Sequence, residues 1–271
     1  MENFNTKDLK KLYIPPKSSH KGDNGKLMMI TGSILFHAAS FWPLEVASRI
    51  VDMVFYSSVR QNNKIVQKEK NEFRNGIIVP REKIEKYIEE ADCILIGPGL
   101  PRKNGQEVGD QDTKILTEKL LIKYPNKKWV VDGGSLQVIS PGILPKTAII
   151  TPHKKEFEIL FNLDSTFENA IKMAKKYNIT ILLKGEEDLV ADALNAIIIK
   201  GGNAGMTKGG TGDVLAGLVA SLYCKNSAFL SAKCASYINK KAGESLFEKK
   251  GIYFNSSDLA AEIPYVMKKL I

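Results

Sequence analysis

The chain has 271 residues, 44% of them hydrophobic and 25% charged, which is typical of a folded globular protein and excludes a disordered or fibrous one. Its formal net charge of +9, from 39 Lys and Arg against 30 Asp and Glu, favours anionic ligands. The basic residues are scattered and no nucleic-acid-binding motif is visible, so we expect a small anionic molecule as the partner and no nucleic acid. Three cysteines without a CxxC pair are expected to be buried reduced thiols.

No targeting or membrane segment is visible in the sequence. The amino end, MENFNTKDLKKLYIPP, is polar and lacks the apolar centre of a signal peptide. No apolar run is long enough to span a bilayer, so we expect a cytoplasmic protein with no membrane partner. No linker, repeat or low-complexity segment interrupts the chain, and residues 1–271 are therefore predicted to form a single domain.

Short apolar runs alternate with helical patterns along the chain. The predicted strands are 26–31, 53–57, 93–96, 129–132, 148–151, 180–183, 188–191 and 196–200. The predicted helices are 38–51, 84–90, 113–124, 156–161 and 167–177, with two or three more near the carboxyl end. The two strands after residue 187 are expected to pair antiparallel. The alternation predicts an α/β protein with a mostly parallel central sheet that helices cover on both faces.

Polar or glycine-containing turns follow five of the predicted strands. These turns are Gly32-Ser33, Gly97-Pro98-Gly99, Asp132-Gly133-Gly134, Thr151-Pro152-His153 and Lys184-Gly185. Ligands of parallel sheets bind at the carboxyl ends of the strands, so we expect the five turns to converge on one rim. There, Asp132 could hold magnesium or orient a substrate hydroxyl, or simply form a turn. His153 could bind a ligand or cap the next helix, and Lys184 could neutralise a phosphate.

The segment 201–222, GGNAGMTKGGTGDVLAGLVASL, carries the strongest functional signal. Its glycines precede an apolar helical run, and free amides at a helix start, together with the helix dipole, form an anion site. Thr211 is predicted to be the N-cap of this helix. Asp213 lies in the first turn, where the dipole favours its ionised form, so it could act as a base beside a bound phosphate. The alternative is a glycine-rich turn that only leads into a buried helix.

Three nucleotide-binding signatures are absent from the sequence. It has no Walker A loop, no G-x-G-x-x-G after a strand, and no protein-kinase motifs. The chain is therefore not predicted to be a P-loop, Rossmann dinucleotide-binding or protein-kinase domain.

Taken together, the motifs resemble the ADP/ATP-dependent NAD(P)H-hydrate dehydratase family, a branch of the ribokinase-like superfamily. They occur in the family's order, as HKGDNGKLMMITGS, ADCILIGPGL, VVDGGSL, ITPHKKEF, ILLKG and the glycine segment. The resemblance implies a ribokinase-like fold and the repair of hydrated NADH or NADPH. In that reaction a nucleotide phosphorylates the hydroxyl of the hydrate, and elimination of phosphate restores the dihydronicotinamide. It also implies ADP or ATP and Mg²⁺ as cofactors, and a homo-oligomer such as a tetramer.

The resemblance also implies roles for individual residues. Asp213 would deprotonate the hydroxyl, while Gly210, Thr211 and Gly212 would stabilise the transferring phosphoryl group. The implied nucleotide-binding positions are Lys184, Gly185, Glu186, Glu187, Asp188, Asn203 and Gly212. The implied substrate-binding positions are Ala39, Gly99, His153 and Asp213.

The chain departs from the family pattern in three places. The glycine-alanine pair that the family usually has after GGS is Ala38-Ala39 here. The family usually reads DADAL where this chain has DGGSL from Asp132, so an acid is lost at Gly134. The family's GPGLG is GPGLP here, ending at Pro101. Many relatives carry an epimerase domain ahead of this one, and because only a short leader precedes His20, we expect no epimerase activity.

Two other functions fit the same residues. A small-molecule kinase of the superfamily, acting on a hydroxymethyl group or a sugar, would share the glycine segment and Asp213. The TPH and GPGL segments favour the dehydratase, and the stable product would discriminate the two. A non-catalytic nucleotide sensor would bind nucleotide without turnover.

Overall fold

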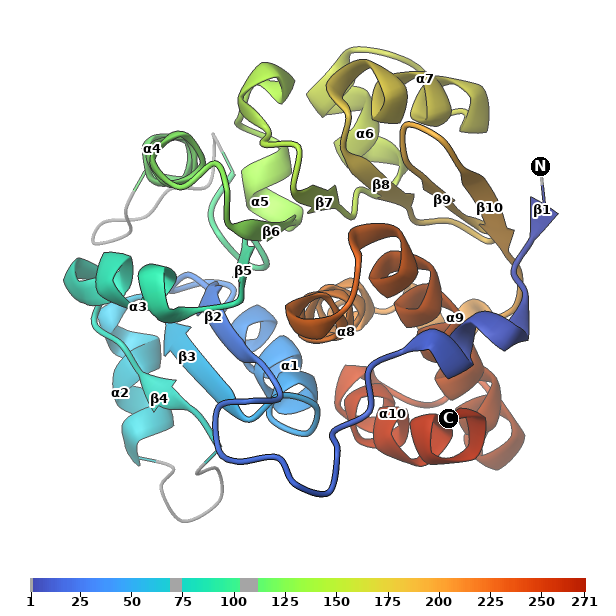
Figure 1. Ribbon diagram of the computed structural model, residues 1–271, viewed down its shortest axis with the longest axis horizontal. Helices are drawn as coiled ribbons and strands as arrows, with labels where there is room; N and C mark the ends of the chain where they lie inside the picture. Colours follow the sequence, from blue (N-terminus) through green and yellow to red (C-terminus); the bar gives the residue numbers. More distant parts are fainter. Residues whose placement is uncertain (1, 69–74, 103–111) are drawn as a thin grey trace.

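The computed structural model describes residues 2–68, 75–102 and 112–271. Its centre is a ten-stranded sheet in the order β1-β10-β9-β8-β7-β6-β5-β2-β3-β4 (Figure 1). Its strands are β1 Glu2–Asn3, β2 Lys26–Ile30, β3 Met53–Ser57, β4 Ile77–Ile78, β5 Cys93–Ile96, β6 Lys128–Val131, β7 Ala148–Ile150, β8 Thr180–Leu183, β9 Asp188–Ala191 and β10 Ala196–Ile199. Only β9 runs antiparallel to its neighbours, β8 and β10. The mostly parallel sheet predicted from the sequence is confirmed.

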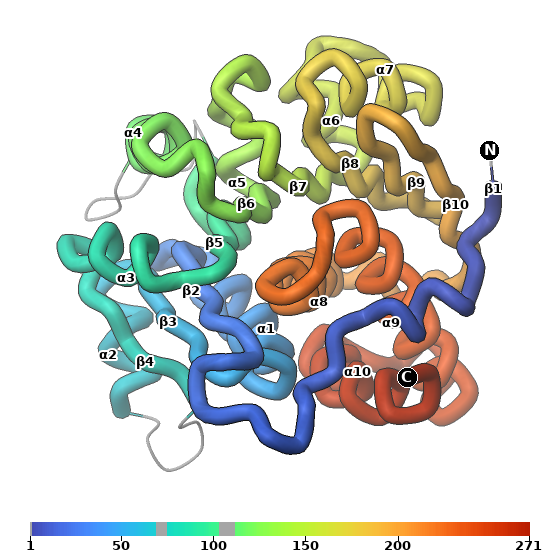
Figure 2. Tube along the Cα trace, viewed as in Figure 1, coloured from blue at the N-terminus to red at the C-terminus, as the bar shows by residue number. Residues whose placement is uncertain are grey.

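Helices lie on both faces of this sheet (Figure 2). The helices are α1 Ala38–Ala47, α2 Arg60–Lys68, α3 Ile84–Glu90, α4 Thr113–Lys123, α5 Gly133–Leu136, α6 Lys154–Phe161, α7 Phe167–Tyr177, α8 Thr211–Lys225, α9 Ala228–Lys250 and α10 Ser256–Leu270, with short 3₁₀ turns η1 Thr6–Lys11, η2 Arg81–Lys83, η3 Pro141–Ile143 and η4 Ala204–Thr207. One layer contains α1, α8, α9 and α10, and the opposite layer contains α3 to α7. Helix α8 packs centrally, against α1, α9 and strands β5 and β6.

The sheet separates two hydrophobic cores. Along β2, Leu27 and Met29 belong to the core beneath α1, α8 and α9, whereas Met28 and Ile30 belong to the core beneath α3 to α7. All four side chains are fully buried. Because successive residues of a strand point to opposite faces, a strand covered on both faces needs apolar residues at every position. This requirement explains why the central strands appear in the sequence as unbroken apolar runs.

The structure differs from the prediction at the end of the first helix and in some elements that were not predicted. The first helix was predicted over 38–51, but it ends at Ala47, and Arg49 and Ile50 donate instead to the carbonyls of Val46 and Ala47. These bonds tighten the chain into a 3₁₀-like turn. Strands β1 and β4 were not predicted because each has only two residues, and α2 was not predicted because its sequence, RQNNKIVQK, is mostly polar.

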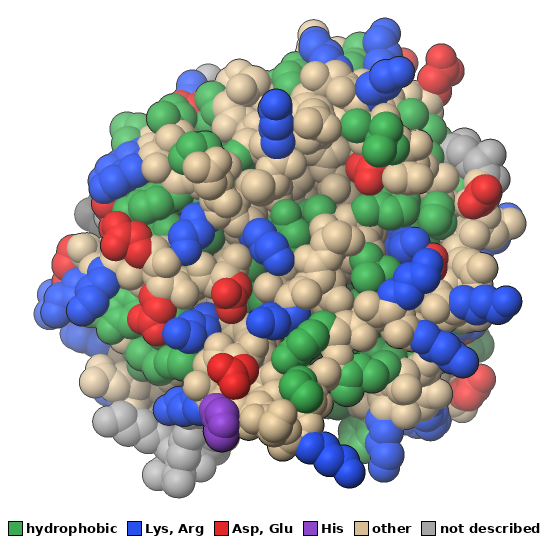
Figure 3. Space-filling model, viewed as in Figure 1, with side chains coloured by type: hydrophobic (Ala, Val, Ile, Leu, Met, Phe, Trp, Pro, Cys, Tyr) green, Lys and Arg blue, Asp and Glu red, His purple; other side chains and the backbone are tan. Residues whose placement is uncertain are grey.

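The basic side chains are scattered over the surface, as they are along the sequence. On the face seen in Figure 3, Lys and Arg side chains are dispersed among acidic and apolar ones and form no continuous basic patch. In the described part of the chain, no helix has the length and apolar character needed to cross a membrane. The three cysteines are buried free thiols, as predicted.

Candidate active site

Two adjoining cavities lie at the carboxyl ends of the central strands. The larger, of about 840 Å³, is bordered by Gly99, Asp132, His153, Lys184 and Asp213, which follow β5, β6, β7 and β8 or begin α8. The smaller, of about 540 Å³, shares the Lys184 and Gly212 region with it. Four of the five predicted turns therefore meet at one rim. The fifth, at Gly32, lies behind it, where the Gly32 amide donates to the carbonyl of Pro98 at 2.8 Å.

The start of α8 offers unpaired amides to the cavities. Gly210 occupies the N-cap position with φ +95°, a left-handed conformation that glycine adopts without strain. Among the described residues, no protein acceptor receives a backbone hydrogen bond from Gly210, Gly212 or Asp213. A Cβ on Gly210 would lie 2.3 Å from the Trp42 ring, so the aromatic ring fits only against glycine. Unpaired amides at the positive end of a helix dipole suit an anion, so this geometry fits the anion site that the sequence predicts, and the site itself stays a prediction.

The predicted cap of α8 was wrong. Thr211 is the first helical residue, and its hydroxyl donates backwards to the carbonyls of Met206 at 2.6 Å and Lys208 at 2.9 Å. Turn η4 brings these carbonyls next to the hydroxyl, so the Thr211 side chain is directed back to η4 and not to the amides of the next helical turn. Thr211 instead fixes the 206–211 loop, while the amides behind it stay free for a ligand.

Asp213 borders the larger cavity, but its charge state differs from the prediction. Burial, with the nearby Asp132 carboxylate, raises the pKa of Asp213 to about 8, and Lys184 only partly opposes this effect. This raised pKa runs against the expectation that the position in the first turn favours the ionised form, because burial and the neighbouring carboxylates favour the protonated one. A carboxyl that titrates close to neutral pH is well suited to accept a proton from a substrate hydroxyl.

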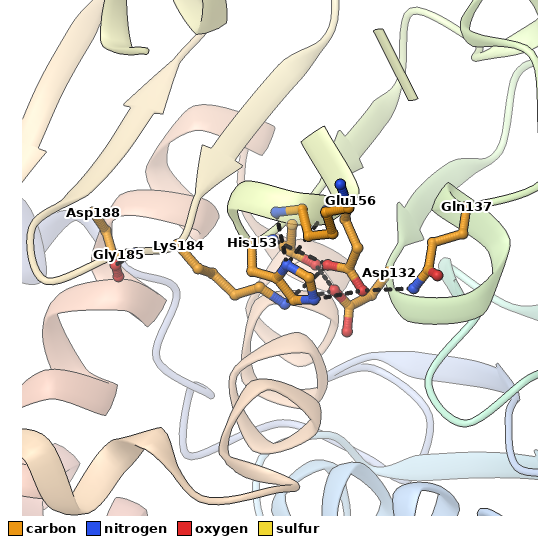
Figure 4. A network of polar contacts seen from close by, with 9 residues as sticks. Asp132, Gln137, His153, Glu156, Lys184, Gly185 and Asp188 are labelled. Atoms are coloured by element: carbon orange, nitrogen blue, oxygen red, sulfur yellow. Dashed lines mark hydrogen bonds and ion pairs between the residues drawn. The ribbon is translucent and has the colours of Figure 1, made fainter. Parts of the chain in front are cut away.

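Lys184 is the buried cation of the site (Figure 4). Its Nζ lies 2.8 Å from Oδ1 of Asp132 and 3.9 Å from Oε2 of Glu156. Burial lowers the pKa of Lys184, but the two carboxylates outweigh it and the pKa is raised, so the side chain stays protonated. Asp132 is held in place by the Thr151 hydroxyl, which donates to the same Oδ1 at 2.8 Å. Lys184 is therefore anchored between the two cavities.

His153 caps α6 and also borders the larger cavity. Its Nδ1 accepts from the amides of Lys155 and Glu156 at 3.1 and 3.3 Å, which is the capping alternative raised by the sequence. Burial and the positive charge of Lys184 lower the pKa of His153, so the imidazole is neutral near pH 7. With Nδ1 accepting, the ring proton must lie on Nε2, which faces Oε1 of Glu156 at 3.4 Å.

Glu156 is a site residue that the sequence analysis did not single out. Its Oε2 accepts from the backbone amide of His153 at 3.0 Å, completing a capping box, and its side chain is about 5% exposed. Burial raises the pKa of Glu156 to about 7. The acid three residues after His153 was the available signal, since this spacing is typical of a capping box.

The predicted nucleotide-binding residues divide between the smaller cavity and its supports. Lys184, Gly185, Glu186, Asp188, Asn203 and Gly212 all border that cavity. The Asp188 carboxylate accepts from the Gly185 amide at 2.9 Å and the Ser236 hydroxyl at 2.7 Å, so it shapes the loop. Glu187 borders neither cavity and pairs with Lys200 at 3.0 Å.

A second support, Lys240 of α9, was not predicted. It is buried, and its Nζ donates to the carbonyls of Gly185, Glu186 and Gly201 at 3.3, 2.9 and 3.3 Å. It thereby joins the two loops that border the smaller cavity. Asn203 orders the second loop, accepting from the Gly205 amide and donating to the Gly243 carbonyl.

The predicted substrate-binding residues border the larger cavity. Ala39, Gly99, His153 and Asp213 all line it, and Gly99 packs against Ala39. The DGGSL departure has a steric reason in this chain, since a Cβ on Gly134 would lie 2.0 Å from the carbonyl oxygen of Leu100. The Gly134 amide also donates to the Gly97 carbonyl at 3.1 Å. The two turns that depart from the family pattern therefore pack directly against each other.

Comparison with known proteins agrees with this geometry. Residues 28–265 match a family model described as NAD(P)H-hydrate dehydratase. The chain is 39% identical to the bifunctional NAD(P)H-hydrate repair enzyme Nnr of Methanocaldococcus jannaschii, over 96% of this chain and 52% of that protein. It is 33% identical to the ADP-dependent (S)-NAD(P)H-hydrate dehydratase of Nitrosopumilus maritimus, over 97% of this chain and 96% of that protein. The chain thus spans about half the length of the bifunctional relatives it matches.

The fold has close counterparts among solved structures. The ADP/ATP-dependent NAD(P)H-hydrate dehydratase of Bacillus subtilis, co-crystallised with ATP/Mg²⁺, superposes with a TM-score of 0.81 at 18% identity, covering 100% of this chain and 99% of that one. The chain thus has a ribokinase-like α/β fold, with unpaired amides at the start of α8 that border the larger cavity. The chain belongs to the NAD(P)H-hydrate dehydratase family.

Proposed function

We propose that this chain catalyses the nucleotide-dependent dehydration of hydrated NADH or NADPH. The observation that carries the proposal is that Asp213 and the unpaired amides of Gly210 and Gly212 border the larger cavity, and that Gly212 borders the smaller cavity as well. The smaller cavity would take the nucleotide and the larger the hydrated dinucleotide. The names of the relatives support this assignment of substrates.

The first step would be phosphoryl transfer to the hydroxyl of the hydrate. Asp213, when ionised, takes the hydroxyl proton as the oxygen–phosphorus bond forms and the bond to the nucleotide's leaving oxygen breaks. The amides of Gly210 and Gly212 would donate to the transferring phosphoryl group, and fixed donors of this kind need no reorganisation during the step. The Thr211 amide, expected from the resemblance to take part, already donates to the Lys208 carbonyl at 3.4 Å. Phosphate is a better leaving group than hydroxide, so its elimination restores the dihydronicotinamide.

The proposed cofactors are ADP or ATP together with Mg²⁺. The described residues contain no cluster of three His, Cys, Asp or Glu able to hold a metal ion. Magnesium characteristically binds to substrate phosphates and water with few protein carboxylates, so we propose that it enters with the nucleotide. It would supply positive charge that neutralises the phosphates. We further propose that the protein is cytoplasmic and forms a homo-oligomer such as a tetramer.

The decisive experiment is an analysis of products. Purified protein, the hydrate, Mg²⁺ and either ADP or ATP should restore the absorbance of the reduced nicotinamide, with release of phosphate and of AMP or ADP. A stable phosphorylated product from a hydroxymethyl compound or sugar would support the rival kinase function. Nucleotide binding without any turnover would support a sensor.

A further inference from the structure

The proposed dehydration moves two protons, and Asp213 accounts for only one of them. Loss of water from the hydrate removes the hydroxyl and one hydrogen of the adjacent ring carbon. Asp213 takes the hydroxyl proton during phosphoryl transfer. When the carbon–oxygen bond then breaks and phosphate leaves, the adjacent carbon–hydrogen pair becomes the new carbon–carbon double bond. A second acceptor must take the proton released from that carbon.

We propose that Glu156 is this second acceptor, the base that removes the ring-carbon proton as phosphate leaves. The proposal rests on the proposed function and concerns its second step. Glu156 reaches the larger cavity from α6, beside Gln137, Asp132 and His153 (Figure 4). Its Oε2 is held by the His153 amide at 3.0 Å, whereas among the described residues Oε1 has only long polar contacts, at 3.4 Å, to Gln137 Nε2 and His153 Nε2. One oxygen is thus positioned and the other is loosely held.

The neighbouring groups are less suited to this role. His153 cannot accept a proton readily, because its Nδ1 already accepts two backbone amides and its Nε2 carries the ring proton. Asp132 accepts from both Lys184 and Thr151 through Oδ1, so this oxygen is already engaged. Asp213, across the cavity on α8, already holds the hydroxyl proton at this stage. These groups and Lys184 are the charged and titratable neighbours that act on Glu156.

The electrostatics of Glu156 fit the task. Its burial and the Asp132 carboxylate raise its proton affinity, and Lys184, 3.9 Å from Oε2, keeps the charged form accessible. General bases work best when they titrate near the operating pH. Once protonated, Glu156 would be neutral beside the departing phosphate, which removes a repulsion between two anions.

The test separates the two steps with the variant Glu156→Gln. Gln keeps an oxygen that can accept from the His153 amide, so the capping box and fold are retained. In a single turnover with ADP, hydrate and Mg²⁺, AMP should form within about threefold of the wild-type rate. Recovery of the dihydronicotinamide should slow by about 10²-fold or more, the usual contribution of a general base, and the phosphorylated hydrate should accumulate. Glu158→Gln, on the same helix, is the matched control and should match wild type in both readouts.

Each outcome decides the proposal. Unchanged recovery in Glu156→Gln, or equal loss of AMP formation and recovery in a folded variant, would overturn it. If the variant does not fold, two other measurements replace it. The first measures recovery of the dihydronicotinamide by the wild type from hydrate deuterated at the ring carbon. The second measures the same recovery by Glu156→Ala with and without added formate. Slower recovery with normal AMP release, and rescue by formate, support the proposal, and their absence overturns it. Failure of the wild type to release AMP would instead contradict the proposed function.

Discussion

Replacing Asp213 by Asn should make the protein more stable as it removes activity. Burial and Asp132 hold the pKa of Asp213 at about 8 instead of 3.8. Each tenfold change in proton affinity corresponds to about 1.4 kcal/mol, so ionising this carboxyl in the folded state costs at most about 6 kcal/mol. Because Asp213 is only partly buried where it borders the cavity, we take somewhat under half of this value, about 2 to 3 kcal/mol. Asn has nearly the same shape and carries no such cost.

The sign of this effect depends on pH in a defined way. A carboxyl whose folded pKa is raised binds its proton more tightly in the folded state, so it destabilises the fold as pH rises from 3.8 to about 8. Urea unfolding of both proteins at several pH values measures it. The variant should gain about 2 to 3 kcal/mol in unfolding free energy above pH 8 and nothing near pH 4. A gain independent of pH, or a loss at pH 8, would refute the reasoning.

Three further changes test the surrounding structure. Asp132→Asn removes the charged partner of the buried Lys184, so it should lower the unfolding free energy by about 3 to 5 kcal/mol. Because the Asp132 carboxylate raises the pKa of Asp213, the variant should also shift the rise of kcat/KM with pH to lower pH, and an unchanged pH profile would contradict the coupling of Asp132 to Asp213. His153→Ala removes the N-cap of α6, so it should lower the unfolding free energy by about 1 kcal/mol. His153→Asn supplies another capping side chain and should retain most of this free energy, and chemical denaturation of the two variants distinguishes them. Gly210→Ala should lower the unfolding free energy by about 1 to 3 kcal/mol and weaken the binding of ADP. Titration calorimetry measures the affinity, and a normal affinity for ADP would show that the α8 amides do not bind phosphate.

The central fold could be predicted from the sequence because its strands are buried on both faces. Residues such as Leu27 and Met28 are both fully buried, in opposite cores, and this produces an unbroken apolar run. Edge elements have no such requirement. The two-residue strands β1 and β4 pair at the margins of the sheet and have no sequence period.

The site could be located from the sequence, but its charge states could not. Asp132, His153 and Lys184 follow parallel strands, so the topology places them on one rim. The pKa of Asp213 depends on its depth and on Asp132, which is distant along the chain. Lys240 likewise lies on a helix with no motif, and only the structure shows that it joins two loops of the smaller cavity.

The role of Asp213 as a base next to bound phosphate is tested most directly by comparing nucleotide affinity with turnover in Asp213→Ala. The amides that bind phosphate remain in this variant while the proton acceptor is gone. ADP should bind within about fivefold of wild type, and turnover of the hydrate should fall by about 10²- to 10⁴-fold. Turnover close to wild type, or loss of ADP binding in a folded variant, would contradict the assignment.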